Sequence, residues 1–453
     1  MGTNADKLMV HMQGATGYAI PYAQIRETQL AAIGERLDER IDRIKLVRHR
    51  AEEAGIKAVR SLEDVVPLLL PHTAYKSYPE SFLSEQRWDR LTKWLGTVSA
   101  HPTDNVDLDG IDSIDMWVDR LAAAGHFVSC SSGTSGKFSV MVSSRADMDW
   151  HCRDGVTACS WGSGVKPAQD RLIFGIAPVA DMPRNLAIRN ALQSAFGIPG
   201  RERFNYPVPS ITVGSITRMI TLRKAIADGS ALPSELAEFE ENSALRQRAV
   251  DEAAGISAEA LIAARHEKLY ITGFWAALHG TATEIRKRGY SGKDFHPENT
   301  CFIAGGLKGA QLPPDYREFV FETLHLDPAS NYQMYSMQEI SSAMPRCREA
   351  GRYHLPPWLV CLPLDEAGET LQPIGPNGQG GEVEGRAAFF DLSLDARWGG
   401  VISGDRIHVD FGPCACGSAS PSIRDDIARY SDLAGDDKIT CSGTVDAYVR
   451  GMA

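Results

Sequence analysis

The stretch FVSCSSGTSGKFSVMV, residues 127–142, limits the fold of this chain more than any other part of the sequence. Its centre is made of small, hydroxyl-bearing and glycine residues followed by a lysine: Ser131, Ser132, Gly133, Thr134, Ser135, Gly136 and Lys137. Such residues let backbone N–H groups and hydroxyls converge on an anion, and the lysine adds a positive charge. The composition predicts a polyphosphate-binding loop, with a Ser/Gly-rich turn of no function as the alternative.

The flanking residues define the kind of loop. The residues before it are strand-like, and SVMV after it alternates polar and apolar side chains, so the loop joins two strands. A Walker A loop needs the spacing GxxxxGK[ST] and opens a helix. Here the first good helix start is Ser144. A Walker loop is therefore excluded.

Composition excludes several classes of protein. The 453-residue chain has a formal net charge of −11, and no basic stripe offsets it, which argues against nucleic-acid binding. We find neither a signal peptide nor an apolar run long enough to cross a membrane. Nine cysteines without a signal indicate reduced thiols. We expect a cytoplasmic protein without a nucleic-acid or membrane partner.

The middle of the chain alternates between strands and helices. Buried strands are predicted at residues 171–178 and 299–306, and a helix that stops at Gly229 lies between them. This order favours an α/β fold with a largely parallel sheet. Short strands separated by glycine-rich turns predict an antiparallel β subdomain at about 355–425. Residues 27–56 predict one long amphipathic helix, and 65–71 an extended connector.

Five motifs occur in an order that resembles one enzyme family. They are SSGTSGK, GGLKG from Gly305, YSMQE from Tyr335, SGDRI from Ser403, and GDDKI from Gly435. Together they resemble the acyl-adenylate-forming superfamily. The resemblance implies a large adenylate-forming domain at 1–428, with mainly parallel sheets sandwiched by helices, followed by a hinge and a short C-terminal segment at 429–453.

Two further stretches narrow the resemblance. CREAGRYHLPPW and the later CACG are most similar to the phenylacetate–CoA ligase branch. PLLLPHTAYKSYP, before the loop, and GGLKG are also similar to acyl-protein synthetases of the fatty-acid reductase type.

The resemblance implies a two-step reaction. A carboxylate attacks the α-phosphate of ATP, which gives acyl-AMP and pyrophosphate, and a thiol then displaces AMP. CoA, the phosphopantetheine of a carrier protein or a protein cysteine are the thiol candidates, and an amine acceptor would give an amide. The first step is mainly a matter of alignment and charge stabilisation, because both reactants are anionic.

The resemblance also assigns roles to residues. Loop residues, with Lys137 as the charged group, would hold the β- and γ-phosphates. Glu339 would ligate Mg²⁺, a hard cation that prefers carboxylate oxygen. Tyr335 would stack on adenine, and Asp405 would accept hydrogen bonds from the ribose. The remaining nucleotide-binding candidates lie in the same motifs: Gly305, Gly306, Ser336 and Gln338.

The chain departs from the family pattern in several places. Phe138 replaces a proline of the loop, Gln338 replaces a threonine near the α-phosphate, and Ala434 stands where the hinge has an arginine. Fifteen residues follow Lys438, so we expect the mobile C-terminal domain and its adenylation lysine to be absent. Either the reaction runs without that catalytic lysine, or Lys438 or Lys308 substitutes for it, or the activity is weak.

Three cysteines and one histidine suggest a metal site. Cys347 and His354 form C-x6-H, and Cys414 and Cys416 form C-x-C about 60 residues later. Three thiolates and an imidazole match a closed tetrahedral Zn²⁺ site, and four ligands leave no open position for catalysis. We predict a structural zinc, with four unrelated small residues as the alternative.

The sequence says less about the acyl pocket and the partners than about the nucleotide and metal sites. YITGFWAALHG suggests an apolar or aryl acid beside Phe274 and Trp275, although a core helix explains these rings equally well. Cys441 is a minor candidate for a covalent acyl carrier. The family leans weakly toward a homodimer. The alternatives are an acyl-protein synthetase subunit that feeds a reductase, and a non-catalytic nucleotide-binding scaffold with structural zinc.

Overall fold

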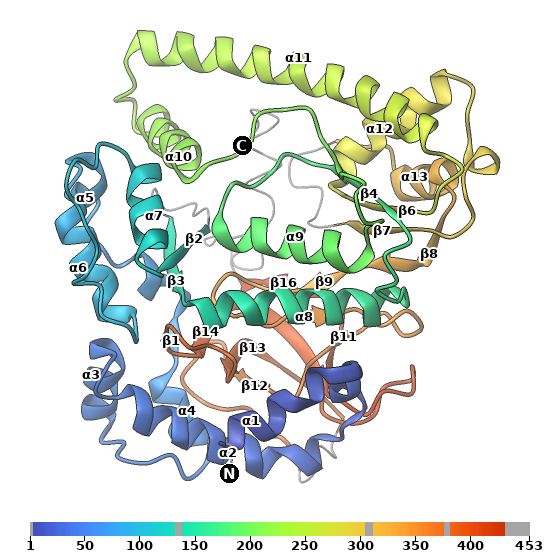
Figure 1. The fold of residues 1–453 in the computed structure, drawn as a ribbon. Helices are drawn as coiled ribbons and strands as arrows, with labels where there is room; N and C mark the ends of the chain where they lie inside the picture. The colour runs from blue at the N-terminus through green and yellow to red at the C-terminus, as the bar shows by residue number, and fades with distance from the viewer. Residues whose placement is uncertain (1–2, 132–137, 304–310, 376–380, 431–453) are drawn as a thin grey trace. The chain divides into compact units, whose positions relative to one another are not determined.

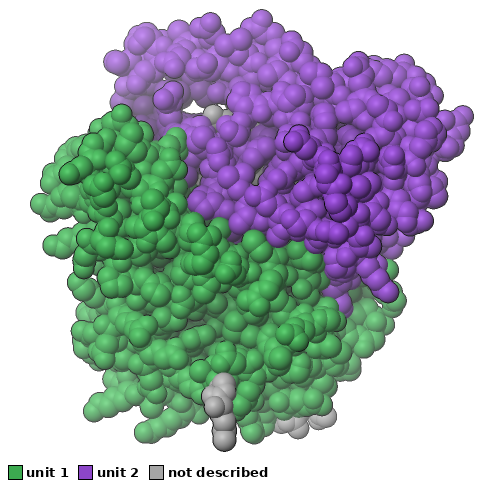
Figure 2. Space-filling view, viewed as in Figure 1, with its two compact units in different colours: residues 1–131, 137–158, 334–439 green, residues 132–136, 159–333, 440–453 purple. Residues whose placement is uncertain are grey.

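The computed structural model describes residues 3–131, 138–303, 311–375 and 381–430, and these form two compact units (Figures 1 and 2). Unit 1 holds the described residues of 1–131, 137–158 and 334–439. Unit 2 holds those of 159–333. Helix α8 (Arg145–Ser163) passes from one unit into the other.

Unit 2 is built on a parallel sheet of five strands in the order β5-β4-β6-β7-β8 (Figure 1). The strands are β4 (Leu172–Ile176), β5 (Phe204–Asn205), β6 (Leu269–Gly273), β7 (Asn299–Ile303) and β8 (Leu326–Tyr332). Strand β4 is buried along its whole length, as expected for a parallel strand covered on both faces. The strands predicted at 171–178 and 299–306 are thereby confirmed over their described residues, as is the parallel sheet.

The helices of unit 2 are α9 (Pro183–Phe196), α10 (Val213–Ala227), α11 (Pro233–Ala263), α12 (Trp275–Lys287), the 3₁₀ turn η4 (Gly292–Asp294) and α13 (Tyr316–Leu324). Helix α10 begins at a capping box, in which Thr212 and Ser215 each bond the other's backbone N–H. It ends before Gly229, whose φ of +74° suits glycine, as predicted. Helices α11, α12 and α13 supply much of the apolar core against the sheet.

Unit 1 contains the predicted antiparallel sheet. Its path is β11-β15-β14-β13-β12, and two short strands, β1 and β16, also pair with β14. The strands are β1 (Leu70–Pro71), β11 (Tyr353–His354), β12 (Leu359–Leu364), β13 (Glu382–Asp391), β14 (Gly400–Asp410), β15 (Ser422–Ile423) and β16 (Ala428–Arg429). Only β1 runs parallel to its partner. Two hairpin-like pairs complete the unit: β2 (Phe127–Ser131) with β3 (Ser139–Ser143), and β9 (Met334–Tyr335) with β10 (Met344–Pro345).

The N-terminal part of unit 1 corrects two predictions. Residues 27–56 are not one helix, because α2 (Tyr22–Arg40) ends before residue 41 and α3 (Lys45–Ala54) begins four residues later. The Arg48 side chain donates to the carbonyls of Ile41 and Asp42, which satisfies acceptors that a continuous helix would use.

The stretch at 65–71 is only partly extended, since α4 (Leu62–Val65) and the 3₁₀ helix η2 (Val66–Leu68) come first. Pro67 fits the first turn of η2, where a missing N–H has no cost.

The remaining helices of unit 1 are α1 (Asn4–Met9), η1 (Val10–Ala19), α2 (Tyr22–Arg40), α3 (Lys45–Ala54), α4 (Leu62–Val65), η3 (His72–Lys76), α5 (Ser81–Ser84), α6 (Trp88–Val98) and α7 (Ile114–Ala123). Helix α8 begins where the sequence predicts, with Ser144 as its cap: Asp147 and Ser144 exchange side-chain-to-backbone bonds. Over the described part of the chain, no helix has the length and hydropathy to cross a bilayer.

Candidate functional site

Strands β2 and β3 flank the predicted phosphate loop. They pair antiparallel from Phe127 with Ser143 to Ser131 with Ser139, so the predicted strand–loop–strand setting is confirmed. Just after the loop, buried Phe138 is fixed by Tyr78, whose hydroxyl donates to the Phe138 carbonyl at 2.8 Å. Two ordered strands therefore hold both ends of the predicted phosphate loop.

Several predicted site residues lie outside the described residues. These are the loop residues Ser132, Gly133, Thr134, Ser135, Gly136 and Lys137, the glycines Gly305 and Gly306, and Lys308, Lys438 and Cys441. The side chain of Ser131 is not described either. Their roles stay predictions.

The structure brings Tyr335 and Asp405 together. Tyr335 ends β9, and its hydroxyl donates to Asp405 Oδ2 at 2.7 Å. Burial, and then the Asp405 charge, raise the pKa of the Tyr335 hydroxyl, so it stays protonated and donates. On the other side of the carboxylate, Arg429 Nε lies 3.5 Å from Asp405 Oδ1, because β16 pairs with β14 at this register. This hydrogen bond places an aromatic ring next to a carboxylate, the two groups to which the sequence resemblance assigns adenine and ribose.

Glu339 is a buried carboxyl near this pair. It is 5% exposed, and burial raises its pKa, while the positive charges of Arg397 and Lys76 lower it and Asp405 raises it further. Carboxylate oxygen is the ligand type that Mg²⁺ prefers, so Glu339 has the chemistry that the sequence resemblance implies, and its metal-binding role stays a prediction. Ser336 and Gln338, the other predicted residues of this segment, are half-buried.

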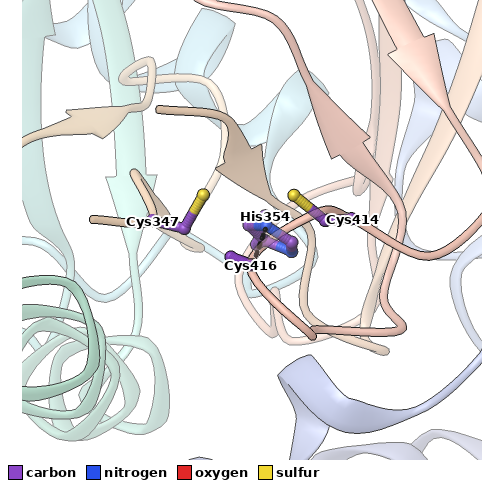
Figure 3. Close-up of side chains that lie close together, drawn as sticks. All are labelled: Cys347, His354, Cys414 and Cys416. Atoms are coloured by element: carbon purple, nitrogen blue, oxygen red, sulfur yellow. Dashed lines mark hydrogen bonds between the residues drawn. The ribbon is translucent and has the colours of Figure 1, made fainter. Parts of the chain in front are cut away.

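The four predicted zinc ligands converge in unit 1 (Figure 3). One ligand atom from each of Cys347, His354, Cys414 and Cys416 lies within 4.8 Å of all the others. A tetrahedral zinc site with Zn–S bonds of about 2.3 Å has sulfurs about 3.8 Å apart, which this cluster approaches. The pairing of β11 with β15 brings the two halves of the sequence pattern together.

Tight turns set the ligands in place. The Cys347 N–H donates to the Arg352 carbonyl, and the Arg352 N–H donates to Cys347 Sγ at 3.3 Å. Beyond Cys414, the chain turns at Gly417, whose φ of +86° requires glycine. Such backbone contacts orient thiolate ligands before a metal binds.

The charge state of the cluster also fits a cation. His354 Nδ1 lies 2.9 Å from Ser420 Oγ, which leaves Nε2 toward Cys416 Sγ at 3.5 Å. Burial, and then Arg352, lower the pKa of His354 to about 4, so the imidazole is neutral and able to ligate. Burial and the neighbouring thiols raise the pKa of Cys416 to about 12. A divalent cation would reverse that rise by stabilising the thiolates.

Phe274 and Trp275 stand at the start of α12 in unit 2. Trp275 is buried in the apolar core, with its ring 5.1 Å from that of Tyr316 and 5.7 Å from that of Phe321. This is the packing role that the sequence allowed as an equal alternative. Phe274 caps the helix and is half-buried. A place for either ring in an acyl pocket stays a prediction.

The sequence patterns miss residues that the fold places around Glu339. Arg397 donates to the carbonyls of Glu339 and Gln338, and Asp391 accepts from the backbone N–H groups of Ser341 and Ser342. Neither residue belongs to a motif, and each is more than 45 positions away in sequence. Their role depends on contacts that form only in the folded chain.

The solved structures that resemble this fold include two with a TM-score of at least 0.5. Both are structures of 2-hydroxyisobutyryl-CoA ligase. One, in complex with 2-HIB-AMP and CoA in the thioesterification state, has a TM-score of 0.52 at 16% identity and covers 91% of this chain and 69% of that one. The other, in the postadenylation state with R3-HIB-AMP, has a TM-score of 0.50 at 15% identity and covers 92% and 73%.

Neither a protein-family model nor a curated protein matches the sequence. At 15 and 16% identity the structural likeness shows the fold alone. It confirms the fold that the ordered sequence motifs predicted.

Proposed function

We propose that this chain, which has the fold of the acyl-adenylate-forming superfamily, is an ATP-dependent acid–thiol ligase. It would activate a carboxylic acid as acyl-AMP, release pyrophosphate, and pass the acyl group to a thiol, with CoA as the first candidate acceptor. The observation that carries the proposal is the hydrogen bond between Tyr335 and Asp405 in unit 1, which joins two of the predicted nucleotide-binding motifs. The residues 1–428 would form the adenylate-forming domain and 429–453 its hinge and C-terminal segment.

The proposed roles follow from what each group can do. The Asp405 oxygens accept hydrogen bonds from ribose hydroxyls, with Arg429 fixing the carboxylate. The Tyr335 ring offers a face to adenine. Glu339 would hold Mg²⁺, which when bound screens the repulsion between phosphate and carboxylate. The loop between β2 and β3 would hold the β- and γ-phosphates through backbone N–H groups, hydroxyls and Lys137.

Alignment and charge compensation are the main contributions of the protein to adenylation. Holding the acid in line with the α-phosphate converts a reaction of two anions into an intramolecular one. We assign the cation at the α-phosphate to Lys438 or Lys308. A small apolar or aryl acid is the proposed substrate class, with Phe274 as one wall of its pocket.

We also propose a structural zinc on Cys347, His354, Cys414 and Cys416. It would tie the turn after β10 to the turn between β14 and β15, and it would take no part in the chemistry, since four protein ligands fill a tetrahedral site. Metal analysis of the purified protein is expected to find one zinc per chain. A protein without stoichiometric zinc would refute this part.

ATP–pyrophosphate exchange across a panel of aryl and fatty acids tests the ligase proposal. We expect exchange with at least one acid, and we expect its loss in Glu339→Gln. Nucleotide binding without exchange for any acid would instead support the scaffold alternative. Where exchange occurs, CoA, a phosphopantetheinylated carrier protein and an amine are each added to the acyl-AMP. The compound that causes release of AMP is the acceptor.

A further inference from the structure

Glu339 lies on a buried segment without regular secondary structure. Residues 338–343, here called the Glu339 segment, connect β9 to β10 and contain neither helix nor strand. Because buried backbone N–H and C=O groups need partners, a segment of this kind depends on side chains to satisfy them. The partners are three ionisable side chains from distant parts of unit 1, with a histidine beside them.

Arg397 holds the first half of the segment. Its side chain is 1% exposed. One terminal nitrogen donates to the Glu339 carbonyl at 2.9 Å and the other to the Gln338 carbonyl at 3.2 Å. Its Nε donates to the Val142 carbonyl at 3.1 Å, which connects the segment to β3. A planar guanidinium can bridge three carbonyls in this way, whereas a lysine cannot.

Asp391 and Asp154 hold the second half. Asp391 Oδ2 accepts from the N–H groups of Ser341 at 2.8 Å and Ser342 at 2.9 Å. Asp154 Oδ2 accepts from the Ala343 N–H at 2.8 Å. The His151 ring lies against the Ser341 carbonyl, with Nδ1 at 3.3 Å. Side-chain donors therefore bond the carbonyls in the first half of the segment, and side-chain acceptors bond the N–H groups in the second half.

The holding groups are themselves anchored. Asp147, at the start of α8, accepts from the N–H groups of Asp395 at 2.7 Å and Ala396 at 3.0 Å, the two residues before Arg397. Asp391 Oδ1 accepts from the N–H and the hydroxyl of Ser393. The rigid support therefore extends from α8 through the β13–β14 turn to Glu339.

Buried charges cost free energy unless every one is bonded, and apolar packing is often the more stable alternative. Charged groups gathered on one short segment point to a requirement for accurate placement there. We propose that Arg397 and Asp391 are positioning residues that fix the backbone on both sides of Glu339 and so set its carboxylate for the metal–nucleotide complex. The inference rests on the proposed function, because it needs Glu339 to be the metal-binding carboxylate.

The test is equilibrium binding of Mn²⁺, followed by electron paramagnetic resonance, to the full chain saturated with a non-hydrolysable ATP analogue. Arg397→Met is expected to raise the Mn²⁺ Kd by about 10- to 100-fold, the range for removing a group that orients a metal ligand. Arg397→Lys is expected to restore only part of the affinity. Affinity for the analogue without metal is expected to change less than about twofold, because the three hydrogen bonds from Arg397 go to backbone carbonyls and not to side chains proposed to contact the nucleotide.

Arg171→Met is the matched control. Arg171 is also a buried arginine that donates to backbone carbonyls, those of Leu269 and Glu298, but it lies in unit 2. We expect this variant to lose thermal stability as Arg397→Met does and to bind Mn²⁺ like the wild type. Equal Mn²⁺ affinity in all folded variants would overturn the inference, since it would reduce Arg397 to a packing role.

Asp391→Asn decides the question if Arg397→Met does not fold. The asparagine keeps the size and one acceptor oxygen, so we expect a folded protein whose Mn²⁺ affinity is lower by about tenfold. If Asp391→Asn binds Mn²⁺ as tightly as the wild type does, the inference is contradicted. The proposed function is unaffected by that result as long as the wild-type chain exchanges pyrophosphate. A wild-type chain that neither exchanges pyrophosphate nor binds Mn²⁺ with the analogue would refute the proposed function itself.

Discussion

Two polar centres of unit 1 are built in opposite ways. The Cys/His cluster gathers four ligands on tight turns, and its groups need a cation to become fully charged. The Glu339 segment carries one metal-binding candidate, and its neighbours are already bonded to backbone. The difference predicts that a cation in the first centre stabilises the fold, whereas a cation at Glu339 acts on a bound ligand.

Glu339→Gln tests this contrast with the largest expected effect. The substitution removes the charge and keeps the shape, so we expect acyl-AMP formation to fall by at least about 100-fold, as for loss of a group that acts in the transition state. Because burial already raises the pKa of this carboxyl, the neutral amide should leave the melting temperature unchanged or higher. Calorimetry and a rate assay on the same preparation measure both. A large loss of stability would place Glu339 with the structural groups.

Cys414→Ser tests the other centre, where the expected loss is in stability. Removal of one ligand from a structural metal site should cost several kcal/mol and lower the melting temperature by about 5 °C or more, with loss of bound zinc. Cys301→Ser is the control, because Cys301 is buried alone in β7 and its hydrogen bond to Asn331 can be kept by serine. If both variants melt alike and the metal content is unaffected, the cluster is ordinary packing.

Tyr335→Phe addresses the Tyr335–Asp405 pair with a smaller change. Loss of the hydroxyl removes one hydrogen bond to a carboxylate, worth about 1.5–3 kcal/mol at most. Only part of this free energy should be lost from ATP binding, because water can replace the lost donor to Asp405 and the aromatic ring remains. We expect the KM for ATP to rise severalfold with kcat nearly unchanged. A fall in kcat alone would assign the hydroxyl to the chemistry.

The smallest predicted effect is on stability at acid pH, and the group responsible, His126, lies outside both centres. Burial, followed by the nearby His101, lowers the pKa of His126 below its ordinary value of 6.5. Below pH 6.5 the unfolded chain therefore binds a proton that the folded chain does not, so stability falls as the pH drops. His126→Gln should flatten this part of the pH–stability curve in urea titrations. An unchanged slope would show that other groups, including His354, carry the acid sensitivity.

The sequence predicts the residues of one centre more completely than those of the other. The Cys/His cluster is predictable, because thiols and imidazoles at short spacings carry their own chemical signature and Gly417 marks the turn. Tyr335, Glu339 and Asp405 are predictable only through the order of their motifs. Arg397 and Asp391 have no local signature, since β13 and β14 pair through long-range register and bring them to residues 338–342.

The same limit applies to the fold, where local signals are predicted correctly and contacts between side chains and backbone are not. The apolar run of β4 and the capped start of α8 are local signals, and both are found where the sequence predicts them. The break between α2 and α3 depends on Arg48 reaching back to the carbonyls of Ile41 and Asp42. Periodicity does not report that contact, so the helix at 27–56 was predicted too long.

Mass-spectrometric detection of acyl-AMP is the most direct test of the central claim. The wild-type chain, incubated with Mg²⁺, ATP and a panel of aryl and small apolar acids, is expected to form one acyl-AMP that Glu339→Gln does not form. Addition of CoA should then consume it and yield the thioester with release of AMP. If nucleotide binds but no acid gives an acyl-AMP in the wild type, the chain is not a carboxylate-activating enzyme and the proposed function is wrong.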